Sequence, residues 1–311
     1  MFGIICWFTE TFGYFWTLVM IYLAIRGLYY FLKSNGLLPK KNVAGEHVFM
    51  TGGGNGIGKL MSKILAKQGA KITVTDINLE WAQKTVDEIT KAGGEATAVK
   101  CDVSSIEEVS KAAQAARDAF GDVTMLINNA GIVTGKKILE VSNELATKTI
   151  MVNTVAHIYT TKEFLPDMIK KNHGHIVTVA SSAGVCGNPG MVDYCASKFG
   201  AVGFDESLRL EIKKMGKNID TTCINPYFIN TGMFEGVKTF NDMILPILDQ
   251  DWAAQRFVNA IRQKEPVVFV PFMSNTVYLT RALLPTYFLE KYFSILGLSD
   301  TMDTFKGKKK D

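Results

Sequence analysis

Three residue types that can share a proton-transfer reaction lie close together in the stretch 181–198, which reads SSAGVCGNPGMVDYCASK. Ser181 precedes Tyr194 by thirteen residues, and Lys198 follows Tyr194 by four. Side chains four residues apart share one face of an α-helix, so a helix here would place the phenol beside the ammonium group. Apolar residues at helical spacing among polar ones predict such a helix: Phe199, Val202, Leu208 and Ile212.

A tyrosine beside a lysine is a candidate acid–base pair. A phenol ordinarily titrates near ~10, which is too high for proton transfer at neutral pH. A nearby ammonium group favours the phenolate, and lowering the tyrosine pKa by ~3 units corresponds to roughly 4 kcal/mol. Ser181 ends an apolar run typical of a buried strand, and its hydroxyl can hydrogen-bond the substrate oxygen that gains or loses the proton. Because Y-x-x-x-K also occurs by chance in helices, other parts of the chain must support this interpretation.

A glycine-rich turn near residue 50 has the sequence of a nucleotide site. The apolar run Val48–Met50 leads into TGGGNGIG, and helical periodicity follows. Glycines in such a turn let the backbone approach a pyrophosphate, which then meets the positive end of the helix. A glycine-rich turn alone is a weak signal, but this one lies between a strand and a helix as the mechanism requires. The predicted contacts are Gly52, Asn55, Gly56, Ile57 and Gly58.

The second expected strand, Lys71–Thr75, is followed by Asp76. A carboxylate at this place accepts hydrogen bonds from both hydroxyls of an adenosine ribose and repels a 2′-phosphate. No Arg or Lys follows immediately, and Asn55 rather than a basic residue precedes Gly56. The sequence therefore favours NAD over NADP as cofactor. The alternative is a surface aspartate that merely ends a strand.

Two further strand ends carry residues suited to the same ligand. Asp102 and Val103 follow the strand 96–100 and are predicted to meet the adenine, while a strand at 123–127 leads into small residues that leave room for a planar ring. Strands and helices alternate four times with short connections. This alternation predicts a doubly wound parallel sheet whose ligand lies at the carboxyl ends of the strands. The small residues are Asn129, Ala130 and Gly131.

Downstream segments are expected to complete the site. The range 150–171 reads as one long helix that carries Asn153, whose polar side chain either makes a local structural bond or holds a water. After a strand at 219–224, the segment 227–232 is predicted to cover the nicotinamide, and Thr231 to bond its carboxamide or a phosphate. The cofactor-binding residues expected here are Pro226, Ile229 and Thr231. Residues 233–250 read as a lid over an apolar substrate, and 266–271 as a last strand. Pocket-wall candidates, for each of which a core role is equally compatible, are Val185, Cys186, Met191, Val192, Phe228, Met233 and Phe234.

Composition excludes several classes of protein. A net charge of +4 without a basic face does not favour a nucleic-acid partner. The five cysteines are an odd number without C-x-x-C or a His–Cys cluster, so we expect reduced thiols and no metal site. No polar linker follows residue 45, which predicts a single globular domain at 41–271.

Both ends of the chain are unusually apolar. Residues 1–40 are predicted to form a membrane or lipid-droplet anchor, whose uncharged run 11–25 is borderline between a spanning helix and a shallow insertion. A buried core helix is the alternative, and no cleavage site suggests a secretory leader. Basic residues follow the anchor, which would leave the domain facing the cytosol. Residues 272–311 read as an apolar interfacial helix pair with a basic tail.

Taken together, the motifs resemble the short-chain dehydrogenase/reductase family over roughly residues 45 to 270. They occur jointly and in order: TGGGNGIG, Asp76, CDV, NNAG, Asn153, Ser181, YCASK and INPYFINT. The resemblance implies a Rossmann-type sheet of about seven strands. It also implies a catalytic tetrad in which Tyr194 is the acid/base and Ser181 orients the substrate oxygen. In the same tetrad Lys198 binds the nicotinamide ribose and lowers the tyrosine pKa, and Asn153 supports a proton-relay water.

Within the family, the apolar amino terminus and runs such as KNVAGE and NTGMFEG are similar to two groups. These are the membrane-associated retinol dehydrogenases, which include epidermal retinol dehydrogenase, and the lipid-droplet 17-beta-hydroxysteroid dehydrogenases. The similarity implies an NAD-dependent enzyme acting on a lipophilic alcohol or carbonyl at the endoplasmic reticulum or a lipid droplet, as a homodimer. A departure is Tyr227, where the family usually has glycine. The rival hypothesis is a lipid-droplet structural protein that keeps the fold with little turnover.

Overall fold

The structure of the 311-residue chain is a computed structural model. It describes residues 37–239, 245–295, 297 and 300–307, together with parts of a helix between residues 14 and 32. The predicted lid at 233–250 therefore lies partly outside the described residues, as do most of the predicted amino-terminal anchor and the end of the basic tail.

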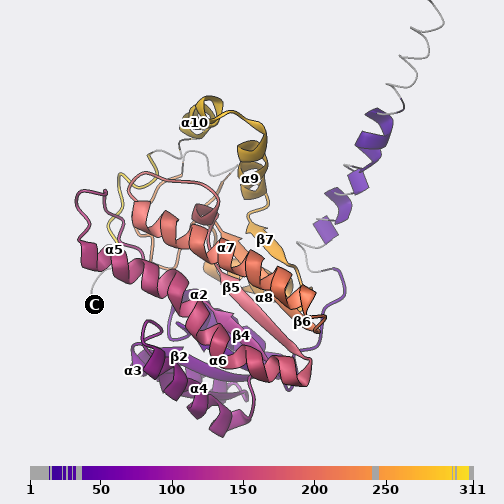
Figure 1. Cartoon of the computed structure of the whole chain (residues 1–311), viewed down its shortest axis with the longest axis vertical. Helices are drawn as coiled ribbons and strands as arrows, with labels where there is room; N and C mark the ends of the chain where they lie inside the picture. Colours follow the sequence, from indigo (N-terminus) through magenta and orange to yellow (C-terminus); the bar gives the residue numbers. More distant parts are fainter. Residues whose placement is uncertain are drawn as a thin grey trace, which may run out of the picture.

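Seven parallel strands form one sheet in the order β3-β2-β1-β4-β5-β6-β7, as Figure 1 shows in part. This confirms the predicted doubly wound sheet, and each strand lies within a few residues of its expected place. The chain order reverses between β1 and β4, which is where ligands bind in such sheets. The strands are β1 His47–Thr51, β2 Lys71–Asp76, β3 Glu95–Lys100, β4 Met125–Asn128, β5 Gly174–Val179, β6 Ile219–Pro226 and β7 Val267–Val270.

Helices cover both faces of the sheet (Figure 1). Alternate residues of one strand serve the two layers: Val48 and Met50 join one core cluster, whereas Phe49 between them joins the other. Burial on both faces explains why the strands read as continuous apolar runs. The first layer contains α2 Gly56–Lys67, α3 Leu79–Lys91 and α8 Gln250–Arg262, and the second contains α4 Ile106–Phe120, α6 Ala156–Lys171 and α7 Val192–Lys214.

The helix predicted from residue 150 is longer and less regular than expected. It starts as α5 at Asn143–Ile150, passes through the π-helical turn Met151–Val155, and continues as α6. Ser142 caps its beginning by accepting a hydrogen bond from the Leu145 backbone. The prediction of one regular helix over 150–171 was therefore wrong at its amino end. π-Helical turns are rare and are frequently found at functional sites.

The chain ends differ from the core in exposure. The described residues 14 to 32 include many exposed aromatic and aliphatic side chains, among them Tyr14 and Trp16. Among the residues that the structure describes, no helix combines the length and hydropathy that crossing a bilayer requires. The predicted carboxyl-terminal helix pair is present as α9 Ser274–Leu283 and α10 Thr286–Ile295, and α10 contains no buried residue.

His157 on α6 gives the fold a specific acid sensitivity. Its imidazole is buried beside Phe204, neither ring nitrogen has a hydrogen-bond partner among the described residues, and Lys198 is close enough to repel its charged form. Burial, with this repulsion, lowers its pKa from 6.5 to about 3. The unfolded chain therefore binds more protons than the native state between these values, so stability that is full above pH 6.5 is lost as the pH falls towards 3.

We expect His157→Leu to remove a large part of this acid sensitivity. A shift of this size corresponds to roughly 5 kcal/mol of unfolding free energy at most. Urea unfolding at several pH values between 6.5 and 4 measures it, and the variant should lose less stability on acidification than the wild type. Burial also lowers the pKa of His175, and this residue contributes the same pH dependence of stability to both proteins. Equal pH slopes for the two proteins would contradict the assignment.

Candidate active site

The three residues of the 181–198 stretch converge at the carboxyl end of the sheet. Ser181 follows β5, and Tyr194 and Lys198 lie one turn apart near the start of α7, as predicted. The Lys198 Nζ lies 5.7 Å from the centroid of the Tyr194 ring. Ser181 and Tyr194 line the same small cavity, and the Ser181 hydroxyl is near enough to the phenol to lower its pKa. All three side chains are buried. A buried phenol, hydroxyl and amine at one strand end can bind and deprotonate an alcohol.

The electrostatics differ from the sequence expectation. Burial raises the pKa of Tyr194 well above its usual range, and the nearby Ser181 hydroxyl lowers it only in part. Burial also lowers the pKa of Lys198 to about 8, and its Nζ donates to the Val179 carbonyl at 2.9 Å. The Tyr194 pKa is therefore raised, contrary to the expectation that Lys198 lowers it, because desolvation of the phenol outweighs the other influences.

Asn153 lies in the π-helical turn and is fully buried. Its Oδ1 accepts from the Ile132 backbone at 2.8 Å, and its Nδ2 donates to the Ile132 carbonyl and to Ser197 Oγ, both at 2.9 Å. Ser197 Oγ in turn donates to the Tyr194 carbonyl at 2.7 Å. The side chain thus makes the structural bonds that were one of the two predicted alternatives. One lone pair of Oδ1 remains for a water.

Gly131 lies next to the side chains of Asn153 and Lys198. A Cβ atom added there would lie 3.3 Å from Asn153 Oδ1 and 3.6 Å from Lys198 Nζ. The absence of a side chain therefore leaves space beside the two residues, as the predicted planar ring requires. Ala130, which precedes it, donates its backbone N–H to Thr51 Oγ1 at 3.0 Å.

The glycine-rich turn is shaped by close contacts within the protein. A Cβ at Gly58 would lie 2.3 Å from the Gly52 carbonyl oxygen and 2.5 Å from Asn129 Nδ2. The Asn129 amide donates to the carbonyls of Thr51 and Gly52 at 2.9 and 3.1 Å. Asn129, predicted to contact the cofactor, therefore uses its side chain to hold the turn.

The start of α2 is open towards the loop after β6. Gly56 has a positive φ of 53°, and Asn55 caps the helix by accepting from the Gly56 backbone at 2.7 Å. A Cβ at Gly56 would meet only Thr231, at 3.6 Å or more. Gly56 and Thr231 are far apart in the sequence, and both were predicted to bind the cofactor. The structure brings them close together. An anionic group fits a helix start of this kind.

Asp76 ends β2 beside the turn. Its Oδ2 accepts from the Gly54 backbone at 3.1 Å, and its Oδ1 accepts from the Asn78 backbone at 3.0 Å. A carboxylate has about four lone-pair sites, so two bonds leave capacity for ribose hydroxyls. The glycine-rich turn, the start of α2 and the Asp76 carboxylate together fit an adenosine-containing dinucleotide.

The other predicted cofactor residues occupy varied positions. Asp102 Oδ1 is bonded by the backbone and hydroxyl of Ser104, at 2.9 and 2.6 Å. The Pro226 carbonyl lies 3.5 Å from the Ser181 hydroxyl. Three of them have side chains in the hydrophobic core and can offer only backbone atoms to a ligand: Ile57, Val103 and Ile229.

Some residues of the site gave no recognisable signal in the sequence. Ser197 links Asn153 to Tyr194, and its position three residues after Tyr194 was the only clue. Thr134 donates to both carboxylate oxygens of Asp193 at 2.9 and 2.8 Å and so ties the loop after β4 to the start of α7. Met302 packs in the same core cluster as Tyr194, although more than one hundred residues separate them.

The cavity beside Tyr194 is small. Its volume is about 30 Å³, and its walls include Ser181, Tyr194 and Tyr227. Four of the seven pocket-wall candidates line it: Cys186, Met191, Phe228 and Phe234. Val192 is instead 48% exposed.

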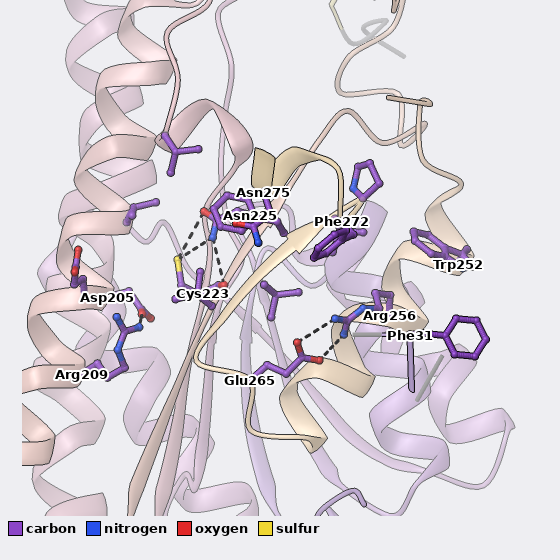
Figure 2. A pocket seen from close by; sticks show the side chains of 18 of the residues that line it. Phe31, Asp205, Arg209, Cys223, Asn225, Trp252, Arg256, Glu265, Phe272 and Asn275 are labelled. Carbon is purple, nitrogen blue, oxygen red and sulfur yellow. Dashed lines mark hydrogen bonds and ion pairs between the residues drawn. The ribbon is translucent and has the colours of Figure 1, made fainter. Parts of the chain in front are cut away.

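A larger cavity, of about 640 Å³, lies along β7 and does not contain the tyrosine, serine or lysine of the site. Figure 2 shows Trp252, Phe272 and Phe31 around it, with the buried Arg256–Glu265 pair joined by bonds of 2.7 and 3.0 Å. Val185, a candidate for the substrate pocket, lines this cavity instead. The larger of these two cavities is therefore not the one that contains the predicted reacting residues.

The chain belongs to the short-chain dehydrogenase family, whose model, described as short chain dehydrogenase, matches residues 46–242. It is therefore an oxidoreductase that acts on CH–OH groups. It is similar to epidermal retinol dehydrogenase 2 of Homo sapiens, with 42% identity over 88% of this chain and 89% of that protein. It is also similar to retinol dehydrogenase 10-B of Danio rerio, with 34% identity over 98% of this chain and 95% of that protein.

A solved structure has the same fold. It is a short chain dehydrogenase/reductase from Burkholderia phymatum in complex with NAD. The two chains superpose with a TM-score of 0.69 at 26% identity, over 81% of this chain and 96% of the other. The family resemblance inferred from the motifs is thus confirmed.

Gly58→Ala tests the close packing of the turn. The new Cβ would clash with backbone at Gly52, so we expect a loss of both thermal stability, by several degrees, and NAD affinity. Gly203→Ala is a matched control, because Gly203 is also helical but has nothing within 4 Å of its Cβ position. The control should gain up to about 1 kcal/mol of stability. Calorimetry and NAD titration measure both effects, and equal behaviour of the two variants would refute the packing argument.

Asp76→Asn tests cofactor choice. The amide keeps an acceptor oxygen but no longer repels a 2′-phosphate, so the preference for NAD over NADP should fall by about tenfold or more. The ratio of kcat/KM values for the two cofactors measures this preference. Asp87→Asn on the exposed side of α3 should leave the ratio unchanged. An unaltered ratio in Asp76→Asn would show that other residues select the cofactor.

Proposed function

We propose that this protein is an NAD-dependent oxidoreductase that interconverts a lipophilic alcohol with its aldehyde or ketone. The observation that carries the proposal is the burial of the Tyr194 phenol and the Ser181 hydroxyl at one small cavity, at the carboxyl end of the sheet that also carries the glycine-rich turn. NAD is the cofactor, since the family and the NAD complex of the Burkholderia enzyme agree with the carboxylate of Asp76. The repulsion of a 2′-phosphate by that carboxylate makes NADP the poorer cofactor.

The substrate class follows from the walls of the site. Aromatic and sulfur-containing side chains surround the hydroxyl pair, including Phe228, Phe234 and Met191. Such walls bind apolar carbon skeletons and offer few partners for a polar one. The relatives named as retinol dehydrogenases make all-trans-retinol the first substrate to test.

Each polar residue has a task in the proposed reaction. Ser181 donates a hydrogen bond to the substrate oxygen and holds it against the phenol. Tyr194 Oη accepts the hydroxyl proton during oxidation and returns it during reduction. Lys198, held by the Val179 carbonyl, binds the nicotinamide ribose, while Asn153 keeps the loop at Ile132 and the Tyr194 helix in register.

NAD, when bound, supplies the hydride acceptor and a positively charged ring. A positive charge beside the phenol favours the phenolate and opposes the effect of burial on the Tyr194 pKa. In the protein alone the tyrosine is therefore held protonated, so we expect it to act as a base only in the complex with oxidised cofactor.

We further propose that the protein works at a lipid surface, namely the endoplasmic reticulum or a lipid droplet, with the domain facing the cytosol. The support is the exposed apolar side chains at both ends of the chain, such as Trp16, Tyr287 and Phe288. A poorly soluble alcohol is concentrated in lipid, so such contact would supply the substrate. A homodimer through α6 and α7 is consistent with exposed Ile158 and Leu210 on these helices.

Tyr194→Phe tests the function. Detergent-solubilised protein with NAD is offered all-trans-retinol, a steroid alcohol and a long-chain alcohol in parallel, and NADH formation is followed. We expect turnover of at least one alcohol and a loss of about 10²-fold or more in the variant, because the proton acceptor is gone. NAD titration of the variant serves as the folding control. Silence of the wild type on all three alcohols with NAD binding intact would favour the structural-protein hypothesis.

A further inference from the structure

The chain returns to the catalytic tyrosine after α10. Four hydrogen bonds fasten the segment 301–306 to two loops around the site. Lys238 N donates to the Thr301 carbonyl at 3.3 Å, and Asn188 Nδ2 donates to Thr301 Oγ1 at 2.9 Å. Lys306 N donates to the Glu235 carbonyl at 2.9 Å, and Thr304 Oγ1 donates to the Gly236 carbonyl at 2.5 Å. The segment therefore lies across the loops at 188 and 235–238.

Two apolar side chains of this segment face the site. Met302 is buried in the core cluster that contains Tyr194, Met191 and Phe228. Phe305 packs behind Phe234, with ring centroids 6.5 Å apart, and Phe234 in turn meets the Tyr194 ring edge-on at 5.9 Å. The side chains therefore form a continuous apolar layer from the segment to the phenol.

Two glycines make room for these side chains. A Cβ at Gly135 would lie 1.9 Å from the Phe305 ring, and a Cβ at Gly190 would lie 3.2 Å from the Met302 Cβ. Both glycines have positive φ angles, of 61° and 74°. The loop after β4 and the loop before α7 thus present bare backbone to Phe305 and Met302.

The cavity under this layer is too small for the proposed substrates. Its volume of about 30 Å³ is comparable to the share of one water molecule. Pockets for organic ligands usually measure about 300 to 1,000 Å³. The sheet and α7 are fixed by the core, so we infer that the space comes from the loops that line the cavity and from the segment 301–306 that packs on them.

We propose that residues 301–306 form a movable cover of the substrate cavity, in which Met302 and Phe305 determine which alcohols fit. The proposal rests on the proposed function for the identity of the substrates. Displacement of the cover withdraws Phe305 from behind Phe234, and this ring can then move away from Tyr194 and leave a channel for an apolar chain. Shortening Phe305 lowers the barrier to that movement.

Phe305→Ala is the first test, with Ile106→Ala as control, since Ile106 is an exposed apolar residue at the start of α4. The kcat/KM values for all-trans-retinol and for the small alcohol cyclohexanol are measured with NAD. We expect the retinol-to-cyclohexanol ratio to change by about tenfold or more in Phe305→Ala and in Met302→Ala, and to stay constant in the control. If the wild type turns over retinol and the ratio is the same in all variants, the proposal is wrong and the proposed function stands.

Hydrogen exchange of the wild type tests the cover without requiring turnover or a stable variant. The amides of Lys238 and Lys306 should exchange much faster than those of β5, and their exchange should slow when NADH and retinol are added together. Exchange as slow as that of β5, with no response to the ligands, would overturn the proposal. Silence of the enzyme assay would count against the proposed function, while the exchange rates would still decide whether the cover moves.

Discussion

The site depends on the burial of an amine and a phenol next to each other. Lys198 and Tyr194 are both almost inaccessible to water, and burial shifts their pKa values in opposite directions, that of the amine down to about 8 and that of the phenol upward. Burial disfavours the charged form of each group, but an amine with a pKa of about 8 still carries its proton at neutral pH, whereas the phenol is uncharged. The Val179 carbonyl accepts a hydrogen bond from the amine, and Ser181 lines the same small cavity as the phenol.

The surrounding fold fixes the position of these groups through polar contacts between distant segments. Asn153 joins the loop after β4 to α7, and Asn129 joins that strand to the glycine-rich turn of β1. The same end of the sheet thus carries both the dinucleotide turn and the reacting hydroxyls. A hydride-transfer enzyme needs this proximity, because cofactor and substrate must meet within contact distance. The π-helical turn that contains Asn153 joins α5 to α6 at this end of the sheet.

The sequence predicted the sheet and most of the site for identifiable reasons. Strands buried on both faces, such as β1 and β5, produce continuous apolar runs. The edge strands β3 and β7 are only partly buried and were predicted from short apolar runs in the alternation of strands and helices. Ser181 follows one strand, and Tyr194 and Lys198 lie on one helix. Their sequence spacing was therefore enough to predict that the three residues lie close together. The irregular start of the Asn153 helix was missed, since a π-helical turn changes the hydrogen bonds without changing the apolar periodicity.

The sequence by itself predicted the fold, the cofactor and the reacting residues, because each strand, turn and helix that contributes to them has its own local pattern of apolar residues, glycines or spacing. Only the tertiary structure decided the direction of the Tyr194 pKa, since desolvation depends on every segment that packs around the phenol. The tertiary structure alone also brought Met302 and Phe305 next to the site. Residues 301–306 are more than one hundred positions from Tyr194, and a contact at that separation leaves no periodic pattern in a single sequence.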